Sequence, residues 1–429
     1  MELDKVQKEI VISQYKNIIV SAGAGSGKTR VLTERVKYLI ESGVNPTNIV
    51  CITFTNKAAD EMRERLADVN GIGDAFIGTI HSFANRILRA SGKKYDLLTE
   101  DKEVEILTTL IARYAKYVDS DTYMKYLNIR RQIKLGLKDE KYLRKQITPS
   151  AIAEINIFYG NGSFLDKRRY PEDLYTVCEK HHIITFDELL IECTEYFNKI
   201  GGKIEYLLVD EVQDIGVNEY EFISALNAEN NFYVGDDFQA IYGFKGSDVR
   251  IFLKLMRSND WKAYHMAANY RNAIKILDAA KNVIHQADDI IEKEIYAVRK
   301  DDGEFEVDSK NAVSKYLKQI KKEGNYKDWF ILARTNKDVY ELAQKCKALK
   351  LPCNTFKQCG MSNDEVSDMM DSDTVKILTV HTSKGLENKN VIVYGNFPLV
   401  QPVYKRNSEE RKIMYVAMTR AKDRLIILN

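Results

Sequence analysis

The sequence carries almost no net charge, and its prolines and cysteines are few. Lys and Arg total 64 against 62 Asp and Glu, so the formal net charge over 429 residues is only +2. Bulk charge therefore does not indicate a nucleic-acid partner, and a local groove would have to hold one. The 6 prolines are spread thinly, so no proline-rich linker marks a domain boundary.

The cysteines and the apolar segments exclude further classes. Six cysteines contain no C-x-x-C pair, which argues against a zinc or iron–sulfur site and against a disulfide framework. The first residues, MELDKVQKEI, are charged and lack the apolar core of a signal peptide. No apolar run approaches the ~18 residues that a membrane-spanning helix needs. We therefore expect a reduced, cytoplasmic protein with no membrane partner.

Short β-branched runs alternate with helical stretches along most of the chain. The spacing is typical of βαβ units, in which buried parallel strands are followed by helices. We predict an α/β fold with strands at Asn17–Ser21, Val50–Phe54, Phe76–Thr79, Leu207–Asp210, Asn231–Val234, Phe330–Ala333, Val375–Val380, Val391–Tyr394 and Leu425–Leu428.

The pattern also divides the chain into domains. Between about Arg89 and His182 the strand signal is replaced by a charged, Tyr-rich helical pattern. A second change falls near Asp260–Lys262. We predict a first α/β domain at 1–88 and 183–262, a helical insertion at 89–182, and a second α/β domain at 263–429.

Residues 17–30, NIIVSAGAGSGKTR, combine an apolar strand, a glycine-rich turn and a helix start. The glycines let backbone N–H groups face a phosphate chain, and the helix adds its positive N-terminal end. Lys28 would reach the β- and γ-phosphates, and Thr29 would bind Mg²⁺. Only the first position departs from the G-x-x-x-x-G-K-[ST] pattern. The predicted phosphate loop is Ala22, Gly23, Ala24, Gly25, Ser26, Gly27, Lys28 and Thr29.

A second segment, EYLLVDEVQD at 205–214, predicts the rest of a hydrolytic site. Its apolar strand delivers Asp210 and Glu211 at the carboxyl end, where open α/β sheets bind ligands. Asp210 would hold Mg²⁺ through water, and Glu211 would position or deprotonate the attacking water. The two segments together predict an enzyme that hydrolyses ATP with Mg²⁺.

These segments resemble the UvrD/Rep/PcrA group of superfamily 1 DNA helicases, and further motifs follow in the same order. The form GDDFQAIYGF is close to the helicase IV branch. The matching segments are LDKVQKEIV (3–11), TFTNKAADEMRERL (53–66), GTIHSFANRIL (78–88), VGDDFQAIYGFKGSD (234–248), NYRN (269–272), LTVHTSKGLE (378–387) and YVAMTRAKDRL (415–425).

The resemblance implies two RecA-like domains and ATP hydrolysis coupled to 3′→5′ movement on single-stranded DNA, or at a junction of single and double strands. By resemblance, Gln7 reads adenine, Tyr270 stacks on it, Arg30 assists there, and Glu387 contacts the ribose.

Two arginines of the second domain resemble the cations that stabilise phosphoryl transfer. The transition state spreads charge over the γ-phosphate oxygens, so Arg271 and Arg420 would complete a site whose phosphate loop lies in the first domain. Hydrolysis would then depend on domain closure, as a motor requires. By resemblance, Gln239 would lie between the γ-phosphate and the DNA path.

The resemblance also assigns DNA contacts. Aromatic faces stack on bases without regard to sequence, and our stacking candidates are Phe54, Tyr242 and Phe244, the last at a position where many relatives have Trp. The candidates for hydrogen bonds to DNA phosphates are Thr55, Asn56, His81, Ser82 and His381.

The chain departs from larger family members after FILARTN at 330–336. Only residues 351–373 stand where those members place a long helical accessory domain, so we expect that domain to be missing or vestigial. Since the last predicted strand ends one residue before Asn429, we also expect no tail of the kind that some relatives use to bind partners. Asn388 stands where many relatives have Phe.

Three other functions remain open at this point. The protein could be a DNA-stimulated ATPase that translocates or strips proteins and needs a partner to unwind. It could be a switch that grips DNA while ATP is bound. It could also be the motor subunit of a helicase–nuclease complex, with the nuclease on another chain.

Overall fold

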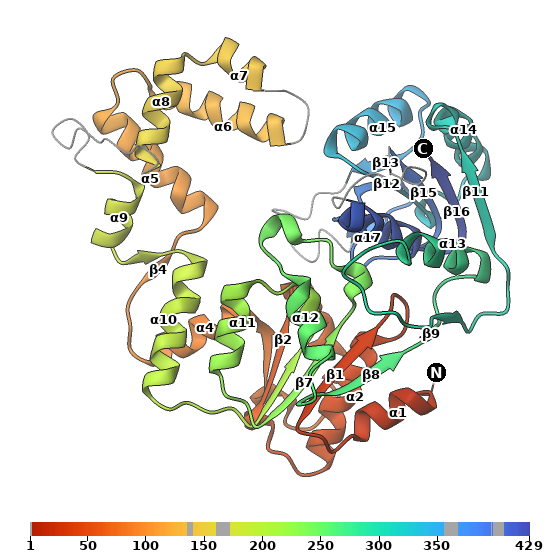
Figure 1. Cartoon of the computed structure of the whole chain (residues 1–429). Helices are drawn as coiled ribbons and strands as arrows, with labels where there is room; N and C mark the ends of the chain where they lie inside the picture. The colour runs from red at the N-terminus through yellow and green to blue at the C-terminus, as the bar shows by residue number, and fades with distance from the viewer. Residues whose placement is uncertain (1, 135–139, 160–171, 356–367, 396, 398–406) are drawn as a thin grey trace. The chain divides into compact units, whose positions relative to one another are not determined.

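The computed structural model describes residues 2–134, 140–159, 172–355, 368–395, 397 and 407–429 (Figure 1). It divides into two compact units, one of residues 1–83 with 197–429 and the other of residues 84–196. The predicted helical insertion, 89–182, falls inside the second unit. Most of the expected vestigial insert, 356–367, lies outside the described residues.

The first lobe of the larger unit is built on a six-stranded sheet. Its strands are all parallel, in the order β3-β2-β6-β7-β1-β8. They comprise β1 (Asn17–Ala22), β2 (Ile49–Thr53), β3 (Phe76–Thr79), β6 (Tyr206–Val209), β7 (Asn230–Gly235) and β8 (Lys262–Met266).

Helices cover both faces of this sheet, as a parallel sheet requires (Figure 1). Ile18, Val20, Leu208 and Val234 of the strands are almost fully buried against them. The helices are α1 (Lys5–Ile12), α2 (Lys28–Glu41), α3 (Asn56–Leu66), α4 (Ile80–Ala90), α11 (Val217–Ala225) and α12 (Val249–Met256).

The second lobe repeats the plan with the parallel order β11-β16-β15-β12-β14-β13. A short parallel pair, β9 (Ala268–Asn269) with β10 (Tyr296–Ala297), precedes it. The elements of this lobe are β11 (Glu304–Asp308), β12 (Trp329–Ala333), β13 (Cys353–Thr355), β14 (Val375–Thr379), β15 (Asn388–Tyr394), β16 (Ala421–Leu428), α13 (Ile274–Ile284), α14 (Val313–Glu323), α15 (Asn336–Ala348) and α17 (Asn407–Met418).

The predicted α/β class is confirmed, and each predicted strand is present within a few residues of its expected bounds. In the two six-stranded sheets, three strands were missed: β8, β11 and β13. Each lies at a sheet edge, where one side stays exposed and the sequence is polar. Because β13 pairs with β14, the start of segment 351–373 belongs to the second sheet.

The smaller unit is mainly helical, as predicted. Its core is a cluster of apolar side chains that includes Leu107, Ile111, Tyr123, Ile155 and Phe158. The elements are α5 (Glu100–Tyr114), α6 (Ser120–Lys134), α7 (Glu140–Gln146), α8 (Pro149–Phe158), α9 (Leu174–Lys180), α10 (Phe186–Lys199) and the pair β4 (Asp96–Leu97) with β5 (Ile183–Ile184). Across the described ranges, no helix is long and apolar enough to cross a membrane.

Candidate nucleotide and DNA site

The predicted phosphate loop connects β1 to α2 and contains two glycines in the left-handed region. Gly25 has φ +67° and Gly27 has φ +88°, so side chains would be strained at both positions. A Cβ at Gly25 would also lie 2.6 Å from the Cβ of Arg271. The glycine at position 25 therefore lets Arg271 of the second lobe lie directly against the loop, which suits a group that both lobes would share.

Lys28 begins α2, and Glu211 follows β6 with a left-handed φ of +54°. The Lys28 Nζ lies 2.9 Å from Glu211 Oε1. Glu211 is held at this position because its backbone N–H donates to Asp210 Oδ1 at 2.9 Å. The structure thus brings the predicted phosphate-binding lysine and the predicted catalytic carboxylate together.

The two adjacent carboxylates differ in proton affinity. Burial, and then the Glu211 carboxylate, raise the pKa of Asp210 to about 7. Burial would raise the pKa of Glu211 too, but the ammonium groups of Lys28 and Lys384 outweigh it and hold that pKa below its ordinary value. The Gln213 amide also donates to Glu211. Glu211 is therefore the carboxylate kept charged, as a base that orients water needs.

The residues present fit Mg²⁺ only if a bound nucleotide supplies some of its ligands. Among the described residues, no cluster of three or more His, Cys, Asp or Glu side chains could hold a metal ion. Thr29 and Asp210 supply one hydroxyl and one carboxylate. Since Mg²⁺ prefers oxygen ligands and retains water, phosphate oxygens and water would have to complete its shell.

The NYRN motif of the second lobe contacts the phosphate loop directly. The fully buried Asn269 donates from Nδ2 to the Ala24 carbonyl at 2.7 Å. The Tyr270 N–H donates to the Gly25 carbonyl at 2.9 Å. Asn272, also fully buried, donates to two carbonyls between α17 and β16. The motif therefore links the loop to the segment that carries Arg420.

Arg420 reaches from the second lobe to the first. Its Nη2 donates to Gln239 Oε1 at 3.0 Å, while Nε and Nη1 donate to the carbonyls of Val416 and Leu386. Gln239 Nε2 donates to Asp236 at 2.6 Å. Burial, and then nearby Arg271, lower the pKa of Arg420 to about 9. Only 1% of the residue is exposed, so its charge would be strongly felt by a neighbouring anion.

Arg271 pairs with Glu387, a residue assigned to the ribose by resemblance. The ion pair joins Arg271 Nε to Glu387, and Lys422 Nζ lies 2.7 Å from the other carboxylate oxygen. A second Arg271 bond runs from Nη1 to the Thr419 carbonyl at 3.3 Å. The two predicted arginines thus lie near each other, with Arg271 held by a partner of opposite charge.

The predicted adenine residues lie beside the N-terminal helix. Tyr270 donates its hydroxyl to Asp4 at 2.6 Å, and Asp4 also caps α1. The Gln7 Nε2 donates to the Ser26 carbonyl at 3.0 Å. Burial, and then the bond to Asp4, raise the pKa of Tyr270 to about 12, and the nearby Arg30 guanidinium opposes this shift. The structure therefore groups these four polar side chains at one end of the phosphate loop.

The predicted DNA-stacking side chains form one aromatic cluster. Phe54 stacks on Tyr242 with 5.4 Å between ring centroids, and Phe244 meets His381 edge-on at 5.2 Å. Tyr242 is 8% exposed, whereas Phe244 is 65% exposed. Phe244 is thus the open face of the cluster, and Tyr242 is packed beneath it.

The residues predicted to contact DNA phosphates lie at the starts of two helices, α3 after β2 and α4 after β3. Thr55 is exposed and caps α3, and Asn56 is the first residue of that helix. Ser82 is exposed in the first turn of α4 and donates to the Thr79 carbonyl. His81 is half-buried next to it. Helix N-termini favour anions, so the placement suits a phosphate backbone.

Lys384 was missed, although it lies in the quoted segment LTVHTSKGLE. Its ammonium pairs with Asp214, donates to the Gln239 carbonyl at 2.9 Å and lies 3.7 Å from Glu211. It also lies 5.1 Å from the centroid of the Tyr242 ring. Its position within a family motif was the one sequence feature that could have identified it. A single lysine beside a glycine in a turn is otherwise typical of a surface residue.

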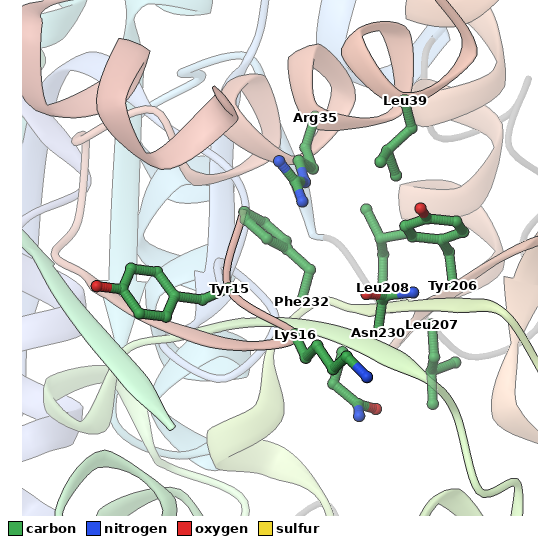
Figure 2. Close-up of a pocket in the computed structure, with 10 residues that line it drawn as sticks. Tyr15, Lys16, Arg35, Leu39, Tyr206, Leu207, Leu208, Asn230 and Phe232 are labelled. Carbon is green, nitrogen blue, oxygen red and sulfur yellow. The ribbon is translucent and has the colours of Figure 1, made fainter. Parts of the chain in front are cut away.

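A small cavity lies at the opposite, amino end of the first sheet. It holds about 10 Å³, room for at most one water. Arg35 reaches from α2 toward the Phe232 ring, 5.7 Å from its centroid, and donates to the carbonyls of Val11 and Ser13 (Figure 2). The cavity is separate from the nucleotide site, which lies at the carboxyl ends of the strands.

Comparison with known families accounts for both lobes. The UvrD/REP helicase N-terminal domain matches residues 3–260, and the UvrD-like helicase C-terminal domain matches 264–370 and 356–429. The chain belongs to the UvrD/REP helicase family. The predicted resemblance is confirmed, and the two parallel sheets of this family member are RecA-like.

Similar proteins include helicases from several bacteria. A probable DNA helicase of Mycoplasma pneumoniae is 30% identical over 469 aligned positions, which cover 100% of this chain and 83% of that protein. The ATP-dependent DNA helicase Rep of Buchnera aphidicola is 29% identical, covering 86% of the chain and 60% of that protein. DNA helicase II of Escherichia coli is 30% identical, covering 68% and 42%. The chain therefore spans only about half the length of the last two relatives.

Proposed function

We propose that this UvrD/REP family member is an ATP-dependent DNA helicase that couples hydrolysis, with Mg²⁺, to 3′→5′ movement on single-stranded DNA. The observation that carries the proposal is the bond between Arg420 of the second lobe and Gln239 of the first. Arg420 lies near Arg271, which in turn approaches Gly25 of the phosphate loop, so a change in the γ-phosphate would alter how the lobes are joined.

A continuous path of contacts supports coupling between this site and DNA. Lys384 bonds to Asp214 and Gln239 on the nucleotide side, and its ammonium lies over the Tyr242 ring on the other side. Tyr242 in turn packs against Phe54 and Phe244. One lysine thus contacts both the catalytic acids and the aromatic cluster that would stack on bases.

The direct test is the rate of ATP hydrolysis against DNA of defined polarity and strandedness. We expect single-stranded DNA to stimulate turnover, and duplexes with a 3′ single-stranded tail to be unwound in preference to those with a 5′ tail. Turnover that is indifferent to DNA would remove the proposal. A preference for the 5′ tail would be consistent with ATP hydrolysis but would show that the direction of movement is 5′→3′.

One specific observation favours a second candidate, a translocating ATPase that unwinds only with a partner, for example a nuclease. Only residues 356–374 connect β13 to β14, the place where larger family members are expected to carry a long helical accessory domain. Two measurements distinguish the autonomous helicase from the partner-dependent translocase: the rate of ATP hydrolysis, and the displacement of a DNA strand with and without a fraction of cell extract. Strong turnover with displacement only in the presence of the fraction would favour this candidate.

The cytoplasmic location stays a prediction.

A further inference from the structure

Lys293 is a lysine that the sequence gives no reason to notice. It lies in the segment between α13 and β10, in the charged run IIEKEIY. Its neighbours Glu292 and Glu294 are exposed, but the Lys293 side chain is only 2% exposed. It turns inward together with Ile295, which packs into the apolar core of the second lobe. Buried lysines are rare unless they are paired.

All three donors of the Lys293 ammonium are used, and every partner belongs to the first lobe. They reach Asp236 Oδ1 at 2.7 Å, Asp237 Oδ1 at 2.6 Å and Ser21 Oγ at 3.0 Å. The ammonium also lies 4.0 Å from the centroid of the Phe238 ring. Both carboxylates are fully buried. An ammonium has three donors and no acceptor, so its capacity is satisfied.

These partners stand at two strand ends that border the nucleotide site. Ser21 is the next-to-last residue of β1, directly before the phosphate loop. Asp236 and Asp237 follow β7, and Gln239 comes two residues after Asp237. Lys293 therefore joins the second lobe to both sides of the first-lobe site.

The bonds around Asp236 fix the orientation of the Gln239 amide. Lys293 donates to one Asp236 oxygen, and Gln239 Nε2 donates to the other at 2.6 Å. With its NH₂ group committed to Asp236, Gln239 presents Oε1 to the Arg420 guanidinium. A flipped amide would instead set NH₂ against a group that only donates. The ammonium of Lys293 therefore favours the amide orientation that accepts from Arg420.

The surrounding charges are nearly balanced. Two buried carboxylates face the Lys293 ammonium, and Lys412, whose Nζ donates to the Asp289 carbonyl, adds a second positive charge nearby. Burial disfavours the charged form of Lys293, but Asp236 and Asp237 outweigh it and raise its pKa. Removing the Lys293 charge alone would leave two buried carboxylates poorly compensated.

We propose that Lys293 is a positioning residue for ATP hydrolysis: by holding Asp236 as an acceptor it orients Gln239 toward Arg420, and so ties the second-lobe arginine to the phosphate-loop strand. The proposal rests on the hydrolytic function proposed above. It assigns Lys293 no contact with the nucleotide.

The main experiment compares ATP turnover of Lys293→Met and Lys293→Arg with that of the wild type, with and without single-stranded DNA. We expect Lys293→Met to lower kcat about tenfold or more while the KM for ATP changes by less than about threefold, since only the transition-state contact is disturbed. Lys293→Arg keeps the charge and should recover part of the kcat. An unchanged kcat, or a loss confined to KM, would overturn the proposal.

Two further variants separate positioning from stability. Lys376→Met removes another fully buried lysine of the second lobe, which donates to the Ser372 and Thr374 carbonyls. We expect it to lower the melting temperature without lowering kcat. If Lys293→Met does not fold, the double variant Lys293→Met with Asp237→Asn restores the charge balance while Asp236 still lacks its lysine. A normal kcat in the folded double variant would contradict the proposal.

A measurement without turnover keeps this test distinct from the proposed function. With glutamine side chains labelled by ¹⁵N, the Gln239 amide signal is identified by its loss in Gln239→Ala. We expect slow exchange of its protons in the wild type and faster exchange in Lys293→Met. Equal exchange would overturn the positioning role even if the protein hydrolyses ATP. A wild type indifferent to DNA, with the exchange difference present, would instead remove only the helicase proposal.

Discussion

Lys28 and Glu211 form an ion pair across the phosphate loop, with 2.9 Å between Nζ and Oε1. The group expected to bind phosphate is therefore held by the group expected to orient water. Lys384 approaches the other Glu211 oxygen at 3.7 Å. Nucleotide binding would draw Lys28 toward the phosphates, and Lys384 would remain near the carboxylate.

From this pair we predict that Lys28→Ala and Glu211→Gln each lower the rate of ATP turnover by on the order of 10²-fold or more. Lys28→Ala should also weaken nucleotide binding, whereas Glu211→Gln should leave it largely intact, since the lysine remains. Steady-state turnover and binding of a fluorescent ATP analogue check this, and circular dichroism confirms the fold. Near-normal hydrolysis in either variant would show that the site is assigned wrongly.

Phe244→Ala should weaken DNA-stimulated turnover more than basal turnover. The ring is 65% exposed at the edge of the aromatic cluster, and loss of one stacked base contact costs ~1–3 kcal/mol. That corresponds to a roughly 5- to 150-fold higher DNA concentration for half-maximal stimulation.

Tyr340 on α15 is a suitable control for this loss because it is also exposed, at 50%. Tyr340→Ala should leave the DNA dependence unchanged. Equal losses of basal and stimulated turnover in Phe244→Ala would make Phe244 a structural residue.

Arg420→Lys should lower kcat by roughly 10- to 100-fold with little change in the KM for ATP. The guanidinium makes bonds to Gln239, Leu386 and Val416 at once, and an ammonium cannot reproduce this planar fork. Steady-state rates of ATP hydrolysis over a range of ATP concentrations give both kcat and KM.

Arg424→Lys provides a matched control in the same lobe, since Arg424 pairs with Glu304, Glu306 and Glu323. It should reduce stability and leave kcat intact. If both arginine variants lose kcat alike, the effect of Arg420 reflects general damage to the lobe.

His381 should make the folded protein sensitive to mild acid. Burial, and then the Arg334 guanidinium, lower its pKa to about 4, against ~6.5 in an unfolded chain. Between these values the unfolded state binds more protons, so the free energy of unfolding falls as the pH drops from about 6.5 toward 4.

Replacement by Asn removes this group. Urea titrations at pH 7 and pH 5 should therefore show a smaller loss of stability in His381→Asn than in the wild type. The same loss in both proteins would mean that His381 titrates normally in the folded state.

Residues that carry their own local signal could be predicted from the sequence. The phosphate loop is continuous in sequence, and its glycine spacing dictates its geometry, so Gly25, Gly27 and Lys28 could be assigned without a structure. The strand that delivers Asp210 and Glu211 is uniformly apolar, because it is buried on both faces.

Lys293 and Lys384 could not be assigned in this way. Each lies in a polar segment, and each finds its partners more than 50 residues away in sequence, where only folding brings the lobes together. The edge strands β8 and β11 could not be predicted from the sequence for a related reason. Their exposed sides allow polar side chains, so the alternation that marks a buried strand is absent.

The passage from β8 to β9 has a mechanical consequence. Met266 ends the first sheet and Ala268 begins the second lobe's first strand, so a single residue separates them, and the chain crosses between the lobes once. At the nucleotide site the lobes are otherwise joined by non-covalent contacts: the hydrogen bonds and ion pairs of Asn269, Arg420 and Lys293, and the packing of Phe238 against Tyr415. Because the backbone connects the lobes at one point, we expect these contacts to break and re-form during domain opening without strain elsewhere in the backbone.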